Sequence, residues 1–235
     1  MRRVLVTRPE PGASRTAERL RTAGCEPVVM ALSKIKVVPV ADFDASRFDV
    51  VAATSANALA HAPRALIETI ADLPCFTVGE KTASEARAAG MENVVAGDGD
   101  GAALAALVTA KTKARERVLY LCGNVRRDDF ESALAAAGRT VLAVETYDTV
   151  ARAVPADESQ RVLSNRPVDA VLVYSQQGAK SLLPLLKAPL LAPLFADARI
   201  LCLSPRIAEV FSGMRVFAAE TPDEDALFTL LGQES

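Results

Sequence analysis

The sequence predicts an α/β protein of two similar domains, each a parallel sheet flanked by helices, joined by a two-stranded linker. Short β-branched runs alternate with alanine- and leucine-rich stretches of helical spacing. The second half of the chain repeats the order of elements in the first half, and two extended segments lie a domain's length apart. Alternation of strand and helix is typical of parallel sheets that are covered by helices.

In the first half, four short apolar runs are each followed by a helical pattern. The run RVLVT precedes a segment in which Ala13, Ala17 and Leu20 recur at helical spacing, and Gly24 supplies a stop signal. The other pairs are FDVVAAT with SANALAHA, CFTVG with EKTASEARAAG, and NVVA with DGAALAALVTA. We expect each pair to form a strand and the helix that covers it.

The second half repeats this plan. The run RVLYL precedes a helical pattern. When Val4 is aligned with Val118, the helical pattern after RVLYL also aligns with the one after RVLVT. The segment VDAVLVYSQQGAKSLL then echoes FDVVAATSANALAHA, so that Asp169 aligns with Asp49, and ILCLSPRIAEVFSGM echoes FTVGEKTASEARAAGM. Repetition of one unit predicts two domains of the same architecture.

Residues 33–40 and 145–154 are the expected linkers, because both segments are extended, β-prone and free of turn signals. One domain then comprises residues 38–149. The other is discontinuous and joins residues 1–35 to residues 151–235. We expect the two linkers to cross together as a short ladder, and the domains to close on a ligand by rocking about them.

Composition excludes several classes of protein. Half of the 235 residues are apolar, which suffices for a sizeable core, and the formal net charge of −2 lacks the footprint of a nucleic-acid-binding protein. The apolar run at the N-terminus is too short for a signal peptide, and LLPLLKAPLLAPLF is broken by a lysine and three prolines. We therefore expect a cytoplasmic protein with no membrane partner.

The four cysteines are far apart, which predicts buried, reduced thiols and no metal site.

Several motifs point away from familiar chemistries. The segment GDGDGA (Gly97–Ala102) nearly matches a dinucleotide fingerprint, but its third glycine comes early and its two aspartates would repel a pyrophosphate, so we expect a helix-entry turn. The single histidine, His61, has no nucleophile motif beside it. The pair Asp128 and Asp129 is expected in the first turn of a helix, where the dipole favours acids.

Hydroxyl, amide and cationic side chains follow nearly every predicted strand, at the edge where parallel sheets bind ligands. The loops begin at Thr7, Thr54, Gly79, Gly123, Ser175 and Ser204. Each loop opens a helix, whose free N–H groups attract anions. The alternative is that the serines and threonines act only as N-caps. Six such loops favour a cleft for a ligand with several carboxylates or phosphates.

The same loops carry a resemblance to a known family. The segments are VLVTRP, TSANA, VGEKTASEARAAG, GNVRRDDFESALAAAG, ETYDT, VYSQQGAKSL and AAETPDEDAL. Their order and spacing resemble the uroporphyrinogen-III synthases over nearly the whole chain. The resemblance implies a monomeric, cytosolic, cofactor-free lyase of haem synthesis. It also implies a polycarboxylate linear tetrapyrrole, hydroxymethylbilane, as substrate, closed with loss of water and inversion of ring D to uroporphyrinogen III.

The resemblance implies a catalytic role for Tyr147, because the matching tyrosine lies in the hinge strand, faces the cleft and helps the substrate hydroxyl to leave. A phenol is protonated at neutral pH and can donate. The alternative is a tyrosine that packs the linker against a domain. The substrate-binding residues that the resemblance implies are Arg8, Thr54, Ser55, Asn57, Lys81, Thr82, Arg127, Ser175, Gln176, Gly178 and Ser204. The last loop departs from the family's pattern, and there we expect Arg206 to contact a carboxylate.

Two other functions remain open at this point. One is a non-catalytic sensor, derived from the synthase fold, that closes on an anion or a tetrapyrrole. The chain shows no helix-turn-helix or other output segment, which argues against this reading. The other is a doubly wound enzyme for phosphorylated small molecules, and the lack of a glycine-rich phosphate loop argues against it.

Overall fold

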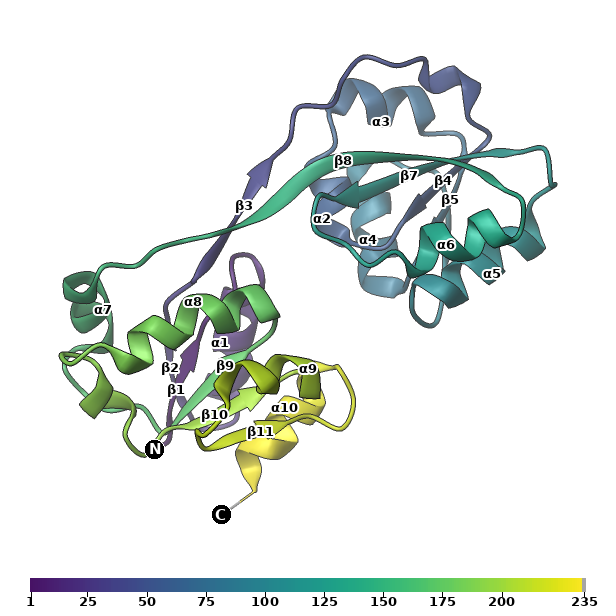
Figure 1. Cartoon of the computed structure of the whole chain (residues 1–235). Coiled ribbons are helices and arrows are strands. Elements are labelled where there is room, and N and C mark those ends of the chain that lie inside the picture. Colours follow the sequence, from purple (N-terminus) through teal and green to yellow (C-terminus); the bar gives the residue numbers. More distant parts are fainter. Residues whose placement is uncertain (234–235) are drawn as a thin grey trace. The chain divides into compact units, whose positions relative to one another are not determined.

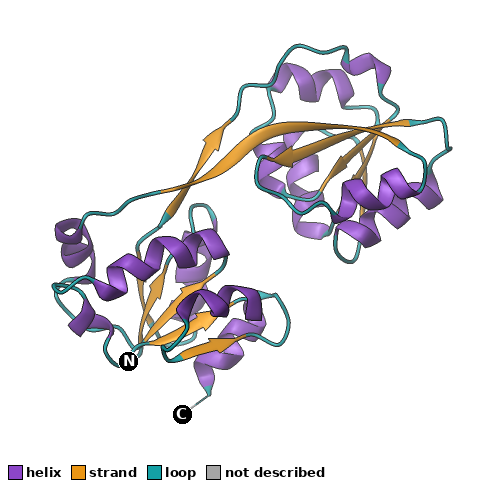
Figure 2. Ribbon diagram, viewed as in Figure 1, coloured by secondary structure: helices purple, strands orange, loops and turns teal. Residues whose placement is uncertain are grey.

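In the computed structural model, which describes residues 1–233, the chain divides into two compact units. Unit 1 joins residues 1–35 to the chain from Val150 onward, and unit 2 is Lys36–Thr149. Each unit is a sheet with helices packed against it (Figures 1 and 2). The fold class predicted from the sequence is confirmed.

Unit 1 contains, within the described residues, a five-stranded parallel sheet of order β11-β10-β9-β1-β2. Its strands are β1 (Arg3–Val6), β2 (Glu26–Val29), β9 (Ala170–Val173), β10 (Arg199–Cys202) and β11 (Val216–Ala218). Its helices are α1 (Gly12–Thr22), α7 (Ala156–Leu163), α8 (Gln176–Lys187), α9 (Pro205–Ala208) and α10 (Glu224–Gly232), with 3-10 turns at Ala192–Phe195 and Glu209–Phe211.

Unit 2 lies wholly within the described residues and is built on a six-stranded sheet of order β3-β8-β7-β4-β5-β6. The strands of this sheet are β3 (Ser33–Val37), β4 (Val50–Ala53), β5 (Pro74–Thr77), β6 (Asn93–Ala96), β7 (Arg117–Gly123) and β8 (Thr140–Ala151). Of these, β3 and β8 extend past the bounds of unit 2 into unit 1. The helices of unit 2 are α2 (Ala56–Ala60), α3 (Arg64–Ile70), α4 (Glu80–Ala89), α5 (Gly101–Lys111) and α6 (Asp129–Ala136), with a 3-10 turn at Ala45–Arg47.

The two sheets share one strand order, which agrees with the predicted repeat. Strands β11, β10, β9, β1 and β2 of unit 1 correspond to β6, β5, β4, β7 and β8 of unit 2. The aligned aspartates make the same contact in both units: Asp49 Oδ2 accepts from the backbone N–H of Arg117 at 2.9 Å, and Asp169 Oδ2 accepts from that of Arg3 at 2.5 Å. Each aspartate therefore ties together the amino ends of two central strands.

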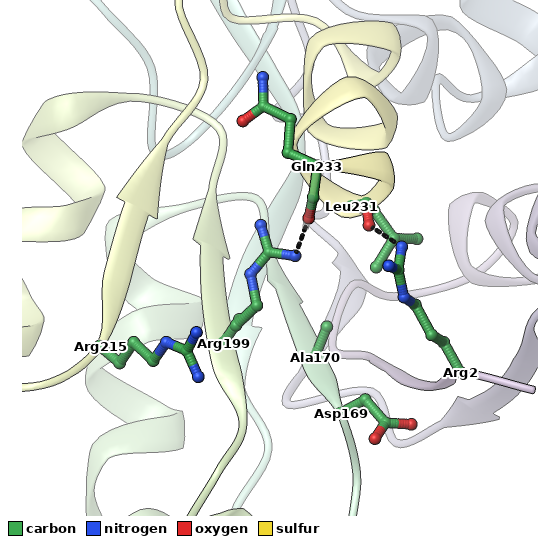
Figure 3. A pocket seen from close by; sticks show the side chains of 7 residues that line it. All are labelled: Arg2, Asp169, Ala170, Arg199, Arg215, Leu231 and Gln233. Carbon is green, nitrogen blue, oxygen red and sulfur yellow. Dashed lines mark hydrogen bonds between the residues drawn. The ribbon is translucent and has the colours of Figure 1, made fainter. Parts of the chain in front are cut away.

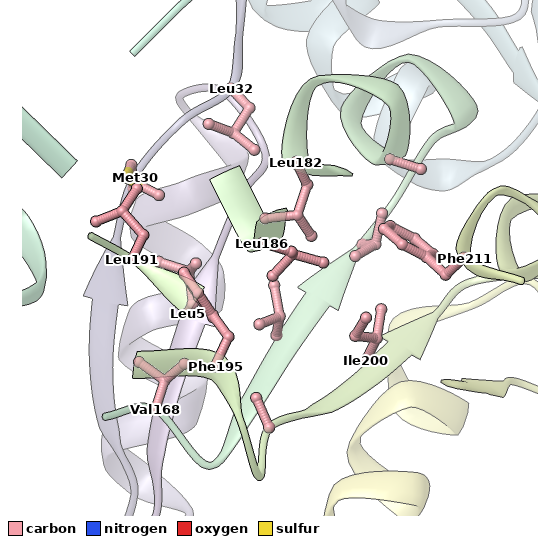
Figure 4. Packing of buried hydrophobic residues seen from close by; sticks show 14 of the residues in the cluster. Leu5, Met30, Leu32, Val168, Leu182, Leu186, Leu191, Phe195, Ile200 and Phe211 are labelled. Atoms are coloured by element: carbon pink, nitrogen blue, oxygen red, sulfur yellow. The ribbon is translucent and has the colours of Figure 1, made fainter. Parts of the chain in front are cut away.

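The central strands of both sheets are buried on their two faces. Successive residues of a strand point to opposite sides, so neighbouring residues enter different cores. In unit 1, Leu5 packs into one core with Leu182 and Phe211 (Figure 4). Its neighbour Val4 enters a second core that contains Leu20. Full burial of one such side chain stabilises the fold by about 1.5–3 kcal/mol. Two-sided burial explains why the strands read as continuous apolar runs in the sequence.

Strands β3 and β8 connect the two units and are neighbours in the sheet order. The N–H of Val38 donates to the carbonyl of Thr146 at 3.0 Å, and that of Arg152 donates to Leu32 at 2.9 Å. Residue numbers rise on one segment as they fall on the other, so the pair runs antiparallel. The expected two-stranded linker is thus present as hydrogen-bonded strands.

All four cysteines are buried free thiols, as predicted. Burial raises the pKa of Cys75, Cys122 and Cys202 to about 12, which keeps these thiols protonated and unreactive at neutral pH. Within residues 1–233, no cluster of His, Cys, Asp and Glu side chains is placed to hold a metal ion. Over the same residues, no helix has the length and apolar character needed to cross a bilayer.

Candidate active site

A cavity of about 390 Å³ lies in unit 2 where strands β4, β5 and β7 end. It is lined by Thr54, Ser55, Val78, Asp100, Gly101, Tyr120, Gly123, Val125, Arg126, Arg127, Asp129 and Tyr147. The carboxyl ends of parallel strands meet at one edge, so loops that are distant in sequence converge there. Four residues singled out from the sequence line this cavity together: Thr54, Ser55, Arg127 and Tyr147.

The hydroxyl of Tyr147 joins β8 to the loop that follows β4. Its Oη donates to Ser55 Oγ at 3.0 Å. The same Ser55 Oγ caps α2 by accepting from the backbone N–H of Asn57 at 3.2 Å. Burial raises the pKa of Tyr147 above its ordinary value, and the hydrogen bond to Ser55 offsets only part of this rise. The phenol is therefore protonated at neutral pH and can serve as a donor.

Tyr147 owes its position to a glycine on the neighbouring strand. It pairs with Gly123 at a register shift between β7 and β8, the kind of irregularity that re-aims a side chain. A Cβ atom added to Gly123 would lie 2.7 Å from Cζ of Tyr147 and 2.9 Å from its Oη. The N–H of Asn124 also donates to the carbonyl of Tyr147 at 2.9 Å. Only glycine leaves room for the ring at this point.

A second tyrosine, Tyr120, holds Thr54 in place. Its ring is buried on β7, 4.6 Å from that of Phe130, and its hydroxyl lies 2.6 Å from Thr54 Oγ1. Burial raises the pKa of Tyr120 to about 12. No motif pointed to this residue. The available signal was a tyrosine inside the apolar run RVLYL, since a buried phenol usually finds a polar partner.

The adjacent residues Arg126 and Arg127 have different environments. Arg126 bonds to both Glu131 and Glu145 at 2.8 Å, and these contacts raise its pKa above the ordinary value. Asn124 also donates to Glu145, and this bond, followed by that from Arg126, lowers the pKa of Glu145. Arg127 is exposed, and its guanidinium has no hydrogen bond or ion pair in the part of the chain that is described. Arg127 is therefore the arginine that can bind an anion in this cavity.

Two carboxylates share the cavity with these arginines. Asp100 caps α5 by accepting from the N–H of Ala103 at 3.0 Å, which confirms the predicted helix-entry turn. Asp129, in the first turn of α6 as expected, lies so close to Gly101 that an added Cβ would meet its Oδ1 at 2.6 Å. The cavity is thus of mixed charge, and neither aspartate had been assigned to a site from the sequence.

Lys81 and Thr82 lie in the first turn of α4, outside the lining of this cavity. Lys81 is exposed, whereas Thr82 is only 5% exposed. The backbone N–H of Thr82 donates to the carbonyl of Gly79 at 3.0 Å, so it is already engaged. Of these two residues, the structure leaves Lys81 more accessible to a ligand.

The remaining predicted residues lie in unit 1, where β9 and β10 end side by side. Ser175 Oγ caps α8 by accepting from the N–H of Gly178 at 3.0 Å, and Gly178 is buried. The amide of Gln176 donates to the carbonyl of Arg206 at 3.2 Å and so bridges the two loops. Ser204 makes no side-chain capping bond to α9, and the side chain of Arg206 is exposed. These residues do gather at one edge of the sheet.

Arg8 stands at the end of β1 but already has partners inside unit 1. Its guanidinium pairs with Glu224 at 3.0 Å and lies 4.3 Å from the ring centroid of Tyr174. Glu224 also accepts from the hydroxyls of Tyr174 at 2.7 Å and Thr16 at 2.5 Å. Burial alone would raise the pKa of Glu224, but hydrogen bonds from Thr16, Tyr174 and Arg19 outweigh it and lower the pKa. The sequence had assigned no role to Glu224 or Tyr174.

Fold and site together define a two-unit α/β protein whose hydroxyl and guanidinium groups gather where parallel strands end. The family model described as "Uroporphyrinogen-III synthase HemD" matches residues 14–229 of this chain. The chain belongs to the uroporphyrinogen-III synthase family, and the resemblance seen in its sequence is confirmed. Membership places it among enzymes of tetrapyrrole synthesis and supports the synthase function over a sensor without chemistry.

Solved structures agree on the fold. The crystal structure of uroporphyrinogen-III synthetase from Helicobacter pylori is similar with a TM-score of 0.68 at 15% identity, over 98% of each chain. A triple mutant of uroporphyrinogen III synthase from the extremely thermophilic bacterium Thermus thermophilus gives a TM-score of 0.56 at 19% identity, over 98% of this chain and 96% of that one. No curated protein gives a significant match.

Proposed function

We propose that this chain is a hydro-lyase that closes hydroxymethylbilane to uroporphyrinogen III, with loss of water and inversion of ring D. The observation that carries the proposal is the hydroxyl pair of Tyr147 and Ser55 in the cavity of unit 2, in a chain of the synthase family. The proposal includes a cytoplasmic location and a monomeric state.

Tyr147 would assist departure of the substrate hydroxyl. The C–O bond breaks as the adjacent pyrrole nitrogen supplies its electron pair, and the oxygen leaves as water after taking one proton. Closure at a pyrrole carbon later releases one proton, so the donor can be restored. Because burial raises the pKa of Tyr147, a strong hydrogen bond to the leaving oxygen is favoured over full ionisation of the phenol.

Ser55 would act together with Tyr147. In the absence of substrate, Ser55 Oγ accepts a hydrogen bond from the Tyr147 hydroxyl at 3.0 Å. With substrate bound, the phenol would donate to the leaving oxygen instead and would accept a hydrogen bond from the Ser55 hydroxyl. Tyr120 would fix Thr54 in a similar way, because their hydroxyls lie 2.6 Å apart. Two hydroxyl pairs at the ends of neighbouring strands would therefore present donors in fixed positions, which is the main requirement for folding a flexible ligand into one geometry.

Carboxylates of the substrate would bind the exposed cations at the carboxyl edges. In unit 2 this is Arg127, together with Lys81 at the start of α4. In unit 1 the donors are Ser175, Gln176, Ser204 and Arg206 at the ends of β9 and β10. Within the cavity of unit 2, Asp100 and Asp129 would repel carboxylates and suit pyrrole N–H groups instead. Such a wall of mixed charge would help to orient the ligand.

An isomer assay tests the proposal. Hydroxymethylbilane is generated in place, the protein is added, and the oxidised porphyrins are separated into types I and III. Spontaneous closure yields type I, so an excess of type III over many turnovers per chain is the expected result. Type I alone, from protein shown by circular dichroism to be folded, would refute the proposal and favour a binding protein of the same family.

A further inference from the structure

Two consecutive residues of β8, Thr146 and Tyr147, both bond to helix α2. The hydroxyl of Thr146 donates to the carbonyl of Ala58 at 2.7 Å, and that of Tyr147 donates to Ser55, the N-cap residue of the same helix. Successive side chains of a regular strand point to opposite faces, so a regular strand cannot direct both of them toward one helix. The backbone of β8 must therefore depart from regular geometry at this point.

The pairing of β8 with β7 shows this departure. Two neighbouring residues of β7 pair with Glu145 and Tyr147, which leaves Thr146 as one extra residue on β8. An extra residue of this kind bends its strand and re-aims the side chains beside it. The register shift thus lets Thr146 and Tyr147 reach the last turn and the N-cap of α2 together.

The hydroxyl of Thr146 satisfies a carbonyl at the end of α2. The last four carbonyls of a helix have no partner within it, and Ala58 is among them because α2 ends at Ala60. The N–H of Ala62, four residues further on, donates to Leu59 instead at 3.2 Å. Both Thr146 and Ala58 are 0% exposed. A buried carbonyl without a hydrogen bond is costly, so this contact holds α2 against β8.

Thr146 cannot touch a ligand, because it is fully buried and does not line the cavity of unit 2. It can act only through its neighbours. The Oγ of Ser55 also accepts from the N–H of Asn57 at 3.2 Å, so a shift of α2 would move Ser55 relative to Tyr147. We infer that Thr146 is a positioning residue, whose buried hydroxyl holds α2 on β8 and so sets the geometry of the Tyr147–Ser55 pair. The effect on turnover rests on the proposed function.

Thr146→Val and Thr146→Ser, made in the full chain, test the inference. The valine keeps the branched shape and removes the hydroxyl, whereas the serine keeps the hydroxyl. Thr146→Val is expected to lower kcat for type III formation by about threefold to tenfold, the loss of one hydrogen bond, with KM nearly unchanged. On the Tyr147→Phe background it should have little further effect, because both act through one hydroxyl pair. Thr146→Ser is expected to keep the wild-type kcat.

A measurement without substrate follows the position of the Tyr147 ring. The chain has three tyrosines and no tryptophan, so NMR spectra of protein with isotope-labelled tyrosine contain few ring signals. The signal that disappears in Tyr147→Phe belongs to Tyr147. Thr146→Val is expected to shift this signal and to leave that of Tyr174, in unit 1, unchanged. Thr146→Ser should leave both signals in place.

A contact of the same kind in unit 1 provides the control, beside a second cavity of about 220 Å³ (Figure 3). There the guanidinium of Arg199 donates to carbonyls at the end of α10, those of Leu230 at 2.6 Å and Gln233 at 2.8 Å. Arg199→Met removes both hydrogen bonds and keeps an unbranched apolar side chain. It is expected to leave kcat and the Tyr147 signal at their wild-type values.

Several results would overturn the inference. A wild-type kcat and an unshifted Tyr147 signal in Thr146→Val would show that the Thr146 hydroxyl positions nothing. Equal losses in Thr146→Val and Thr146→Ser would assign the effect to packing, and equal losses in Arg199→Met would assign it to general loosening of the fold. If the wild type formed only type I product, the proposed function would fail, and the Tyr147 signal would still decide whether Thr146 sets the position of the ring.

Discussion

The hydroxyl of Tyr147 donates to Ser55 Oγ across a distance of 3.0 Å, although the two residues are 92 positions apart in the chain. Each has a second tie: Tyr147 lies against Gly123, and Ser55 caps α2. The pair is therefore held by three elements of unit 2 rather than by one flexible loop. Such fixed donors are what a reaction governed by positioning requires.

Tyr147→Phe is expected to lower kcat for type III formation by about threefold to tenfold, because one hydrogen bond of about 0.5–1.5 kcal/mol is lost. KM should change little, since the ring remains. Ser55→Ala should lower kcat by a smaller factor in the Tyr147→Phe variant than in the wild type, because the two hydroxyls act as a pair. Steady-state rates of type III formation check both statements, and an unaltered rate in Tyr147→Phe would show that the hydroxyl is idle.

Gly123→Ala is expected to lower kcat by at least as much as Tyr147→Phe. The added Cβ would lie 2.7 Å from Cζ of Tyr147, so the ring must move away from Ser55. Gly232→Ala is the matched control, because its Cβ would meet nothing within 4 Å. Measured on the Tyr147→Phe background, Gly123→Ala should have little further effect. If Gly123→Ala lowered kcat by its full factor on the Tyr147→Phe background, Gly123 would affect activity by a route other than the position of the Tyr147 ring.

Arg127→Gln is expected to raise KM by about tenfold with kcat nearly unchanged, because an exposed cation that binds a carboxylate contributes equally to ground and transition states. The dependence of KM on salt should also weaken. Arg126→Gln should instead lower Tm, because it removes the ion pairs that Arg126 makes with Glu131 and Glu145. Kinetics at two ionic strengths and a melting curve separate the two arginines. Equal effects on Tm would contradict the assignment.

Glu224→Gln is expected to destabilise the protein by about 1–3 kcal/mol at pH 7, since the partners of a partly buried charge are left imperfectly paired. The pKa of Glu224 is lowered in the folded state, so its contribution is present above the ordinary glutamate pKa and is lost as pH falls through the folded pKa. The difference from wild type in urea unfolding should therefore shrink well below pH 4.5.

Asp225→Asn provides the control for Glu224→Gln. Asp225 lies on the same helix and also pairs with Arg19, but its side chain is 85% exposed. A surface ion pair contributes at most about 1 kcal/mol, so this variant should unfold near the wild type at every pH. A pH-independent loss in Glu224→Gln would show that the carboxylate charge is not what stabilises the network.

Local sequence patterns determined much of this protein. Strand and helix alternation predicted the parallel sheets, the repeat predicted two domains of the same architecture, and spacing predicted the turn capped by Asp100. Burial of Cys75 and Cys122 followed from the apolar runs around them. These features depend on a residue and its near neighbours, through periodicity, capping and burial, and so can be seen along the chain.

Only the tertiary structure decided which polar groups meet. The sequence singled out Arg8 as a ligand contact, whereas the fold pairs it with Glu224, 216 residues away. It offered no sign that Tyr120 supports Thr54, or that Tyr174 donates to Glu224. The physical reason is that these contacts depend on strand order and register, which set neighbours across a sheet independently of distance along the chain.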